Sequence, residues 1–323
     1  MSSQNKSILV AIVGTGLVGA ELVNQLLCLS RSQFKIVSLS SSKATLFAAN
    51  GLAITQADWR AIFQQSAAPT ILSALSGELQ GLVKAGNKVV LVDNTSADSV
   101  AKMYPHFLAA GINVVTPNKK AFSTDQQLFE DITKASSESR ARFLNESTVG
   151  AGLPIISTLK DLVATGDTEP HPGDDLNGAD VARKLTILSR TIPALSGALP
   201  EGYKSVQTRS LVPPALTALA TGDEFMTRLP EFDEEFDALR AEAQKEGKVL
   251  RYVGVVDVEK GIIKASLEKY ENSHAFATSL GGSDNIIMFH TKRYGARPLT
   301  VQGAGAGAAV TSMGVLSDLL KLS

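Results

Sequence analysis

Apolar residues alternate between strand-like and helix-like spacing along the first half of the chain. Residues 7–13 read SILVAIV, an almost unbroken β-branched and aliphatic run that is typical of a central parallel strand buried on both faces. Residues 21–29 then repeat their apolar side chains at helical intervals. Further strand-like runs follow at 34–39, 69–75, 88–93 and 112–117, with helical segments between them. This order predicts an α/β fold with a Rossmann-like, doubly wound parallel sheet.

The second half of the chain has a different pattern. Residues 249–270 alternate apolar and polar side chains on both sides of a Glu-Lys-Gly turn, which predicts two strands. Residues 284–294 predict a further strand, whereas residues 228–248 are typical of a solvated helix. We therefore expect a second, α+β domain, whose antiparallel sheet can join its copy in a two-fold homodimer.

A glycine turn, GTGLVG, lies between the first predicted strand and the first predicted helix. Gly14 permits the tight turn, Gly16 lets the backbone approach a pyrophosphate, and Gly19 lets the helix pack on the strand. The helix N-terminus then offers free N–H groups to phosphate oxygens. An ordinary glycine-rich turn is the alternative, but the order of strand, turn and helix favours dinucleotide binding. The predicted cofactor-binding turn consists of Gly14, Thr15, Gly16, Leu17, Val18 and Gly19.

Ligands of doubly wound sheets bind at the carboxyl ends of the strands. Residues 93–96 and 116–120 follow two predicted strands, so they are candidate ligand-binding residues at the same edge of the sheet. The second strand ends in SLSSSK, without the Asp or Glu that normally holds a ribose 2′-hydroxyl. Ser41, Ser42 and Lys43 can instead accept a 2′-phosphate, which favours NADP(H) over NAD(H). A solvated turn remains the alternative for this short loop.

The composition narrows the class of protein. Among 323 residues, 44% are hydrophobic and 20% are charged, as in a soluble globular protein with room for two domains. The net charge is −1 without a basic stripe, so we expect no nucleic-acid partner. No apolar run is long enough to span a membrane, and the start lacks the features of a signal peptide. The single cysteine, Cys28, fits the reducing cytoplasm, and its position in the first helix predicts a buried thiol.

Residues 168–184, TEPHPGDDLNGADVARK, collect four carboxylates and end on a lysine. Asp180 and Lys184 are four residues apart, so a helix places them on one face about one turn apart. We expect Asn177 or Asp175 to cap this helix. Two interpretations of the pair remain open from the pattern: a surface ion pair contributing about 0.3–0.5 kcal/mol, or a catalytic acid–base pair.

Five stretches of the chain carry more specific motifs. They are VAIVGTGLVG (10–19), VDNTS with TPNKKAFS (92–96 and 116–123), NESTVGAGLPII (145–156), the acidic stretch 168–184, and QGAGAGAAVTSMGV (302–315). Together they resemble the homoserine dehydrogenases, particularly the fungal type, over almost the whole chain. The resemblance implies an NAD(P)-dependent oxidoreductase that interconverts L-homoserine and L-aspartate 4-semialdehyde, in the pathway to threonine, methionine and isoleucine. We place its dinucleotide-binding domain at 1–147 plus 303–323, and its substrate-binding and dimerisation domain at 148–302.

The resemblance also implies roles for particular residues. Lys184 would be the acid–base group held by Asp180, and Lys119 would contact the cofactor ribose and the substrate. A lysine acts as a base only where desolvation or a neighbouring cation favours its neutral form. The implied substrate-binding carboxylates are Glu169, Asp174, Asp175 and Asp180, and the implied cofactor-binding residues after the strands are Thr95, Ser96 and Lys119.

A monovalent cation is a further implication of the resemblance. Sodium would be bound by the side chain or backbone of Glu146 and by the carbonyls of Val149, Ala151 and Leu153. Such hard oxygen ligands on a turning backbone suit sodium, although the same segment is compatible with a domain hinge. Near the C-terminus, Gly307 would let the returning chain approach the nicotinamide end of the cofactor before a final apolar helix.

The chain departs from the family between Asp167 and Thr168. Family members carry a segment there that includes a strand of the substrate domain, whereas ATGDTEP joins the flanking parts directly in this chain. The alternative function is therefore a catalytically impaired NAD(P)-binding protein of the same fold.

Overall fold

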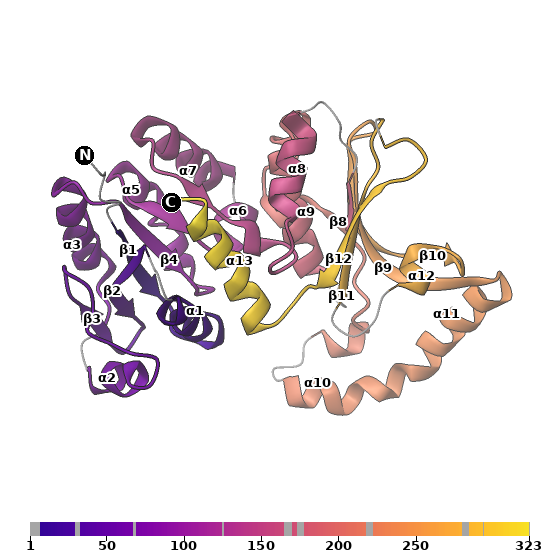
Figure 1. The fold of residues 1–323 in the computed structure, drawn as a ribbon. Coiled ribbons are helices and arrows are strands. Elements are labelled where there is room, and N and C mark those ends of the chain that lie inside the picture. The colour runs from indigo at the N-terminus through magenta and orange to yellow at the C-terminus, as the bar shows by residue number, and fades with distance from the viewer. Residues whose placement is uncertain are drawn as a thin grey trace. The chain divides into compact units, whose positions relative to one another are not determined.

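The computed structural model describes residues 7–29, 33–66, 69–124, 126–164, 170–172, 178–217, 222–279, 284–292 and 294–322. These residues form two compact units (Figure 1). The first unit contains the described residues up to Thr158 and from Ala304 onward, and the second contains those from Leu159 to Gly303. No helix in these ranges is long and apolar enough to cross a membrane.

The first unit is built on a six-stranded sheet with the order β3-β2-β1-β4-β5-β6 (Figure 1). Its strands are β1 (Ile8–Val13), β2 (Phe34–Ser40), β3 (Thr45–Phe47), β4 (Val89–Asp93), β5 (Asn113–Val115) and β6 (Phe143–Leu144). Neighbouring strands are parallel except for β3, which is antiparallel to β2. The predicted Rossmann-like α/β fold is confirmed. The chain switches direction between β1 and β4, so ligands are expected beyond the carboxyl ends of these two strands.

Helices cover both faces of this sheet. On one face, α1 (Leu17–Cys28), α2 (Trp59–Gln65) and α13 (Ala308–Leu320) share a hydrophobic core with alternate residues of β1. Helix α13 packs beside α1, where Gln25 Nε2 donates a hydrogen bond to Ser312 Oγ at 2.9 Å. Figure 1 shows α3, α5 and α7 on the other side of the sheet. The other helices of the unit are α3 (Leu72–Lys84), α4 (Asp98–Ala101), α5 (Tyr104–Ala109), α6 (Lys120–Ser123), α7 (Gln126–Ser139) and the 3₁₀ helix η1 (Glu146–Thr148).

Two local predictions are wrong in this unit. The apolar run 69–75 predicts a strand, but α3 begins at Leu72. Its apolar side chains continue at helical spacing, and Leu75 and Leu79 are the ones that become buried. Cys28, predicted as a core residue, is exposed because it ends α1 outside the buried face of that helix.

The second unit contains two three-stranded sheets, with the orders β8-β10-β9 and β12-β11-β7. Their strands are β7 (Pro170–Pro172), β8 (Gln207–Thr208), β9 (Lys248–Asp257), β10 (Ile262–Glu271), β11 (Asp284–Phe289) and β12 (Leu299–Ala304). β9 and β10 form the antiparallel pair predicted for residues 249–270, with Asp257 opposite Ile262. A core of Val253, Val255, Phe276, Ile286 and Met288 joins β9 to β11.

Helix α9 (Ala179–Thr191) carries the candidate residues Asp180 and Lys184. It packs against β9, β10 and the 3₁₀ helix η3 (Gly202–Ser205). The predicted solvated helix is confirmed in α11 (Asp233–Lys245). The remaining elements are α8 (Ile155–Ala164), α10 (Gly222–Arg228), α12 (Ala275–Thr278), η2 (Pro193–Leu195), η4 (Pro214–Leu216) and η5 (Leu229–Phe232).

Candidate functional site

The glycine turn connects β1 to α1 through two close backbone approaches. Gly14 has φ +91°, and a Cβ there would lie 2.8 Å from Thr95 Cγ2, while a Cβ on Gly19 would overlap the carbonyl oxygen of Gly14. Gly16 is different, because nothing lies within 4 Å of the position that its Cβ would take. No side chain caps the start of α1, so its first N–H groups are available to phosphate oxygens. The turn therefore has the shape of a pyrophosphate cradle, with the space left at Gly16.

Asn94 belongs to the predicted edge segment 93–96, but its sequence pattern predicts no particular role for its side chain. Its backbone N–H donates to Val13 O at 2.8 Å, which places it at the end of β4 beside the glycine turn. Both polar atoms of its side chain are buried without a hydrogen-bond partner, and Nδ2 lies 3.4 Å from the position that a Cβ on Gly19 would take. An unsatisfied buried amide costs about 1–3 kcal/mol, and a bound ligand that pairs with it offsets that cost. This orphaned amide fits a dinucleotide at the turn.

The predicted cofactor residues after β4 and β5 lie in two loops that hydrogen bond to each other. Thr95 Oγ1 accepts a hydrogen bond from Ala97 N at 3.1 Å, and Ser96 is exposed. Lys119 directly precedes α6, and its carbonyl accepts a hydrogen bond from Ser123 Oγ at 2.8 Å. Because Asn118 Nδ2 donates to Ala97 O at 3.3 Å, the loop carrying Lys119 adjoins the loop carrying Thr95. The first unit thus gathers these candidates and the glycine turn at the carboxyl edge of its sheet.

The C-terminal chain returns to the first unit at Gly307. This residue precedes α13 and has φ +122°, a backbone conformation that residues other than glycine rarely adopt. Nothing lies within 4 Å of where its Cβ would be. Gly307 therefore gives α13 its entry angle and leaves open space beside the backbone.

Asp180 and Lys184 form the ion pair that their spacing predicts. Lys184 Nζ lies 3.0 Å from Asp180 Oδ2, and only 15% of the lysine side chain is exposed. Val181 and Leu185, the residues that directly follow the pair in α9, are buried and pack in the unit's core. The ammonium group is therefore held at a half-buried position rather than extended into solvent.

The start of α9 depends on a glycine, not on the predicted cap. Gly178 occupies the N-cap position with φ +71° and no side-chain cap, so the prediction of Asn177 or Asp175 as the cap is wrong. A Cβ on Gly178 would overlap Tyr252 Oη and Thr208 Cγ2. Glycine is required because Gly178 lies directly against side chains of β9 and β8 and has a positive φ.

The acidic loop itself lies outside the described residues. Glu169, Asp174, Asp175 and the junction between Asp167 and Thr168 are therefore not described. Between these parts, the backbone of β7 pairs antiparallel with β11, with His171 opposite Met288. The substrate-binding roles of these carboxylates remain predictions.

Glu146, predicted as a sodium ligand, has other partners in the structure. Its buried carboxylate accepts hydrogen bonds from the backbone N–H groups of Ile156 and Ser157 at the start of α8, at 2.6 and 3.1 Å. Lys321 Nζ lies 3.2 Å from its other oxygen. These donors contact both carboxylate oxygens, and the role of Glu146 as a sodium ligand remains a prediction. No cluster of three or more His, Cys, Asp or Glu side chains suited to a metal occurs in the described part of the chain.

The predicted carbonyl ligands near Glu146 lie on a tight turn. Ala151 has φ +53°, and its carbonyl oxygen lies 2.9 Å from the position that a Cβ on Gly314 would take. The carbonyl of Leu153 accepts a hydrogen bond from Ile155 N at 2.9 Å. Val149 is buried. The carbonyl form of the sodium site remains a prediction.

Lys321 also pairs with a second buried carboxylate, Asp318, at 2.9 Å. Asp318 Oδ2 accepts a hydrogen bond from Glu146 N, also at 2.9 Å. Burial raises the pKa of Asp318, although Lys321 opposes that shift. Burial alone would lower the pKa of Lys321, but Asp318 and Glu146 outweigh it and raise that pKa. The cluster fastens α13 to the segment that enters α8.

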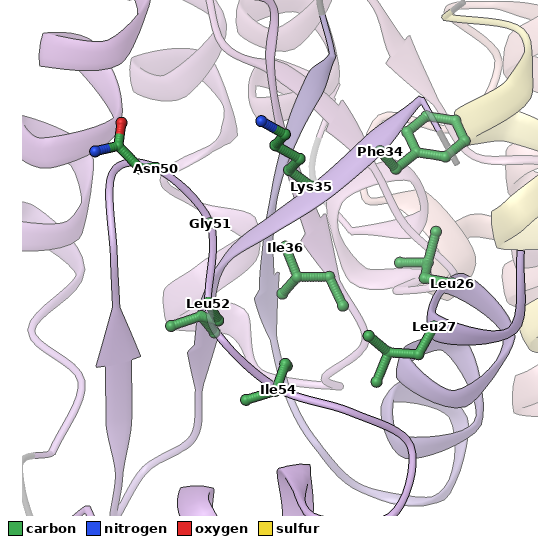
Figure 2. Close-up of a pocket in the computed structure, with 9 residues that line it drawn as sticks. All are labelled: Leu26, Leu27, Phe34, Lys35, Ile36, Asn50, Gly51, Leu52 and Ile54. Atoms are coloured by element: carbon green, nitrogen blue, oxygen red, sulfur yellow. The ribbon is translucent and has the colours of Figure 1, made fainter. Parts of the chain in front are cut away.

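A separate pocket of about 280 Å³ lies at the amino end of β2, away from the cofactor edge. Figure 2 shows Leu26, Leu27 and Ile36 on its apolar floor, with the Lys35 amine pointing away from them. Ser40, at the carboxyl end of the same strand, accepts the hydrogen bond of Gly14 N. None of the predicted site residues lines this pocket.

Comparison with known proteins identifies the family. The family model for homoserine dehydrogenase matches residues 142–320, and the model for the homoserine dehydrogenase NAD binding domain matches residues 14–146. The homoserine dehydrogenase of Schizosaccharomyces pombe is 42% identical over an alignment that covers 100% of this chain and 97% of that enzyme. The chain belongs to the homoserine dehydrogenase family. As a homoserine dehydrogenase, it is an oxidoreductase with an NAD(P)-binding domain, which confirms the predicted family and class of reaction.

Solved structures place this homoserine dehydrogenase among proteins of the same fold. A crystal structure of a protein of unknown function from Candida auris is 39% identical, with a TM-score of 0.87 and 98% of each chain covered. A hyperthermophilic archaeal homoserine dehydrogenase solved in complex with NADPH is 19% identical, with a TM-score of 0.69. That comparison covers 98% of this chain and 97% of the archaeal chain, and it shows the shared fold.

The alignment with the Schizosaccharomyces pombe homoserine dehydrogenase extends over 372 positions, whereas this chain has 323 residues. The relative therefore contains positions that have no counterpart in this homoserine dehydrogenase. A segment absent near Asp167 would account for them, and its location remains a prediction.

Proposed function

We propose that this homoserine dehydrogenase interconverts L-homoserine and L-aspartate 4-semialdehyde, with Lys184 as the acid–base group. The observation that carries the proposal is the half-buried ion pair of Lys184 with Asp180 on α9. A nicotinamide cofactor, when bound, supplies or accepts the hydride. In the reducing direction, Lys184 donates a proton to the aldehyde oxygen as hydride reaches the carbonyl carbon. In the oxidising direction, the same nitrogen takes the hydroxyl proton as the C–H bond is broken.

Asp180 acts through Lys184 in this proposal. Its carboxylate, 3.0 Å from Lys184 Nζ, fixes the position of the amine that transfers the proton. Lys119 supports the same chemistry as a second cation at the cofactor ribose and the substrate. The carboxylates Glu169, Asp174 and Asp175 hold the ammonium and hydroxyl ends of homoserine. These roles rest on the motif resemblance and on the family membership.

For the cofactor we propose NADP(H), with NAD(H) as the alternative. The loop after β2 offers Ser41, exposed Ser42 and Lys43 without a carboxylate that would repel a 2′-phosphate. The archaeal relative of the same fold was solved with NADPH, which agrees with this choice. The ratio of kcat/KM for NADPH to that for NADH tests it, and a ratio below one would overturn it.

Three finer proposals accompany the activity. If a sodium ion is bound by Glu146 and the backbone carbonyls of Val149, Ala151 and Leu153, sodium should raise the midpoint of thermal unfolding more than choline does at equal ionic strength. A homodimer predicts twice the chain mass of 34.0 kDa in light scattering. A cytoplasmic location predicts that the protein remains in the cytosolic fraction.

The test of the activity is oxidation of NADPH by the purified chain with L-aspartate 4-semialdehyde. Formation of L-homoserine supports the proposal. Binding of NADPH without oxidation would instead support the catalytically impaired alternative. The intact mass of the same preparation shows whether the segment before Thr168 is present in the molecule.

A further inference from the structure

Asp93 is a fully buried carboxylate that has no role in the reaction proposed above. It is the last residue of β4, at the cofactor edge of the sheet. Oδ1 accepts a hydrogen bond from Thr95 N at 2.8 Å. Oδ2 accepts hydrogen bonds from the Tyr104 hydroxyl at 2.5 Å and from Asn118 Nδ2 at 3.0 Å. All three donors are electrically neutral.

Burying this carboxylate is costly unless its lone pairs are satisfied. Three hydrogen bonds satisfy its two oxygens, and a buried acceptor that lost a donor would carry a desolvation cost of about 1–3 kcal/mol, so the network resists the loss of any one donor. Burial, and after it the neighbouring Asp93, raise the pKa of the Tyr104 phenol well above its ordinary value of 10.0, so the hydroxyl stays protonated as a donor. The network therefore has little freedom to rearrange.

Two of the donors belong to different loops of the cofactor edge. Thr95 is in the loop after β4, and Asn118 is in the loop after β5. A second contact ties the strand ends together, because Thr116 Oγ1 donates to the backbone carbonyl of Asp93 at 2.8 Å. One residue at the end of β4 thus fixes the spacing of both loops.

Asn118 transmits this constraint to its neighbour Lys119. Its backbone N–H donates to Thr116 Oγ1 at 2.8 Å, and its side-chain Oδ1 accepts a hydrogen bond from Lys120 N at 3.1 Å. The backbone is therefore held on both sides of Lys119. If the Asn118 amide were released, the direction in which Lys119 leaves the backbone would no longer be fixed.

We propose that Asp93 is a positioning residue of the enzyme, which sets the place of Lys119 at the cofactor edge through Asn118. The inference rests on the proposed function for the role of Lys119 toward cofactor and substrate. It assigns Asp93 no contact with either ligand. Removal of the constraint is expected to weaken cofactor binding and turnover more than the loss of stability alone explains.

The test compares two buried asparagines near opposite ends of β5. Asn118→Ala breaks the contact to Asp93 together with the side-chain hydrogen bonds to Ala97 O and from Lys120 N. Asn113→Ala breaks hydrogen bonds to Val89 O and from Arg142 N, both 2.9 Å, at the first residue of β5. Both variants should lower the unfolding midpoint by similar amounts. Only Asn118→Ala should raise the dissociation constant for NADPH, by about tenfold, as measured by NADPH fluorescence without substrate. Equal NADPH affinities of the two variants would overturn the proposal.

A double-mutant cycle identifies the residue through which the network acts. In a Lys119→Met background, Asn118→Ala should change the NADPH dissociation constant by less than about twofold, because the positioned side chain is already absent. Additive losses would show that the network does not act through Lys119. Asp93→Asn provides a second variant, since one amide oxygen cannot serve both Thr95 and Asn118, and it should show the same dependence on Lys119. Because NADPH binding is measured without turnover, these results are independent of whether the wild type reduces aspartate semialdehyde.

Discussion

Lys184 Nζ lies 3.0 Å from Asp180 Oδ2, one turn apart on α9. The lysine side chain is largely shielded, whereas a third of the aspartate side chain is exposed. The pair is positioned by buried neighbours on its helix and by the glycine that starts that helix. An ordinary surface ion pair would contribute little to stability and nothing to turnover. The proposed catalytic pair therefore makes predictions that an ordinary pair does not.

Replacement of Lys184 tests its role in proton transfer. Lys184→Met should lower kcat for NADPH oxidation by about 10²–10⁴-fold, the range expected for loss of a general acid, with the NADPH dissociation constant nearly unchanged. Lys264→Met is a matched control, because Lys264 pairs with Glu268 at 2.7 Å with the same spacing but lies on β10. A Lys184→Met variant with kcat close to that of the control would exclude the proposed role.

Gly16 and Gly19 should respond differently to the same substitution. A Cβ on Gly19 overlaps the Gly14 carbonyl, so Gly19→Ala should destabilise the first unit by several kcal/mol. Gly16→Ala meets no protein atom, so its unfolding midpoint should stay close to that of the wild type. Its methyl group nonetheless occupies the space left for the pyrophosphate, so NADPH affinity should fall by at least about tenfold. Thermal unfolding and NADPH titration of both variants measure the difference, and normal NADPH binding by Gly16→Ala would argue against a cradle at this turn.

The Lys321 cluster predicts a pH-dependent contribution to stability. Lys321→Met leaves Asp318 and Glu146 buried without their cation and should destabilise the protein by about 2 kcal/mol, less than for a fully buried pair because Lys321 is partly exposed. The pKa of Lys321 is raised on folding, so its stabilisation is fully present below the ordinary value of 10.5 and is lost as pH rises through the folded value. The difference in unfolding free energy between wild type and variant should therefore shrink in alkaline solution.

Lys264→Met serves as the control for this cluster as well. Its side chain is 36% exposed, close to the 37% of Lys321, but its partner Glu268 is 34% exposed, whereas Asp318 is 2% exposed. Denaturant unfolding should show a much smaller effect for Lys264→Met. Equal effects of the two substitutions would mean that burial of the carboxylates adds nothing.

His274 should make the second unit sensitive to mild acid. Its Nδ1 accepts a hydrogen bond from Phe276 N at 3.1 Å and caps α12, which requires an unprotonated nitrogen. Burial, with a smaller effect of His290, lowers the pKa of His274. The contribution of His274 is therefore present above the ordinary value of 6.5 and is lost as pH falls through the lower folded value. His274→Asn keeps an acceptor without titrating, so its unfolding midpoint should fall less than that of the wild type below pH 6.5; parallel declines would contradict this.

The parts of the structure that could be predicted from the sequence are those set by nearby residues. The strand at 7–13, the glycine turn and the spacing of Asp180 with Lys184 all depend on residues within one or two elements of each other. Residues 69–75 were ambiguous, because a short apolar run suits a buried strand and a helix face equally well.

The site features that the sequence did not predict depend on distant parts of the chain. Gly178 is needed because Tyr252 and Thr208 fold against it. The carboxylate of Glu146 is filled by Lys321, 175 residues away in sequence. Neither relationship has a local pattern in the sequence.

The central claim is that this homoserine dehydrogenase reduces L-aspartate 4-semialdehyde with a nicotinamide cofactor. It is tested most directly by measuring NADPH consumed and L-homoserine formed by the purified chain in the same reaction. One L-homoserine should form for each NADPH oxidised. A chain that is fully folded and binds NADPH, yet forms no homoserine, would contradict it.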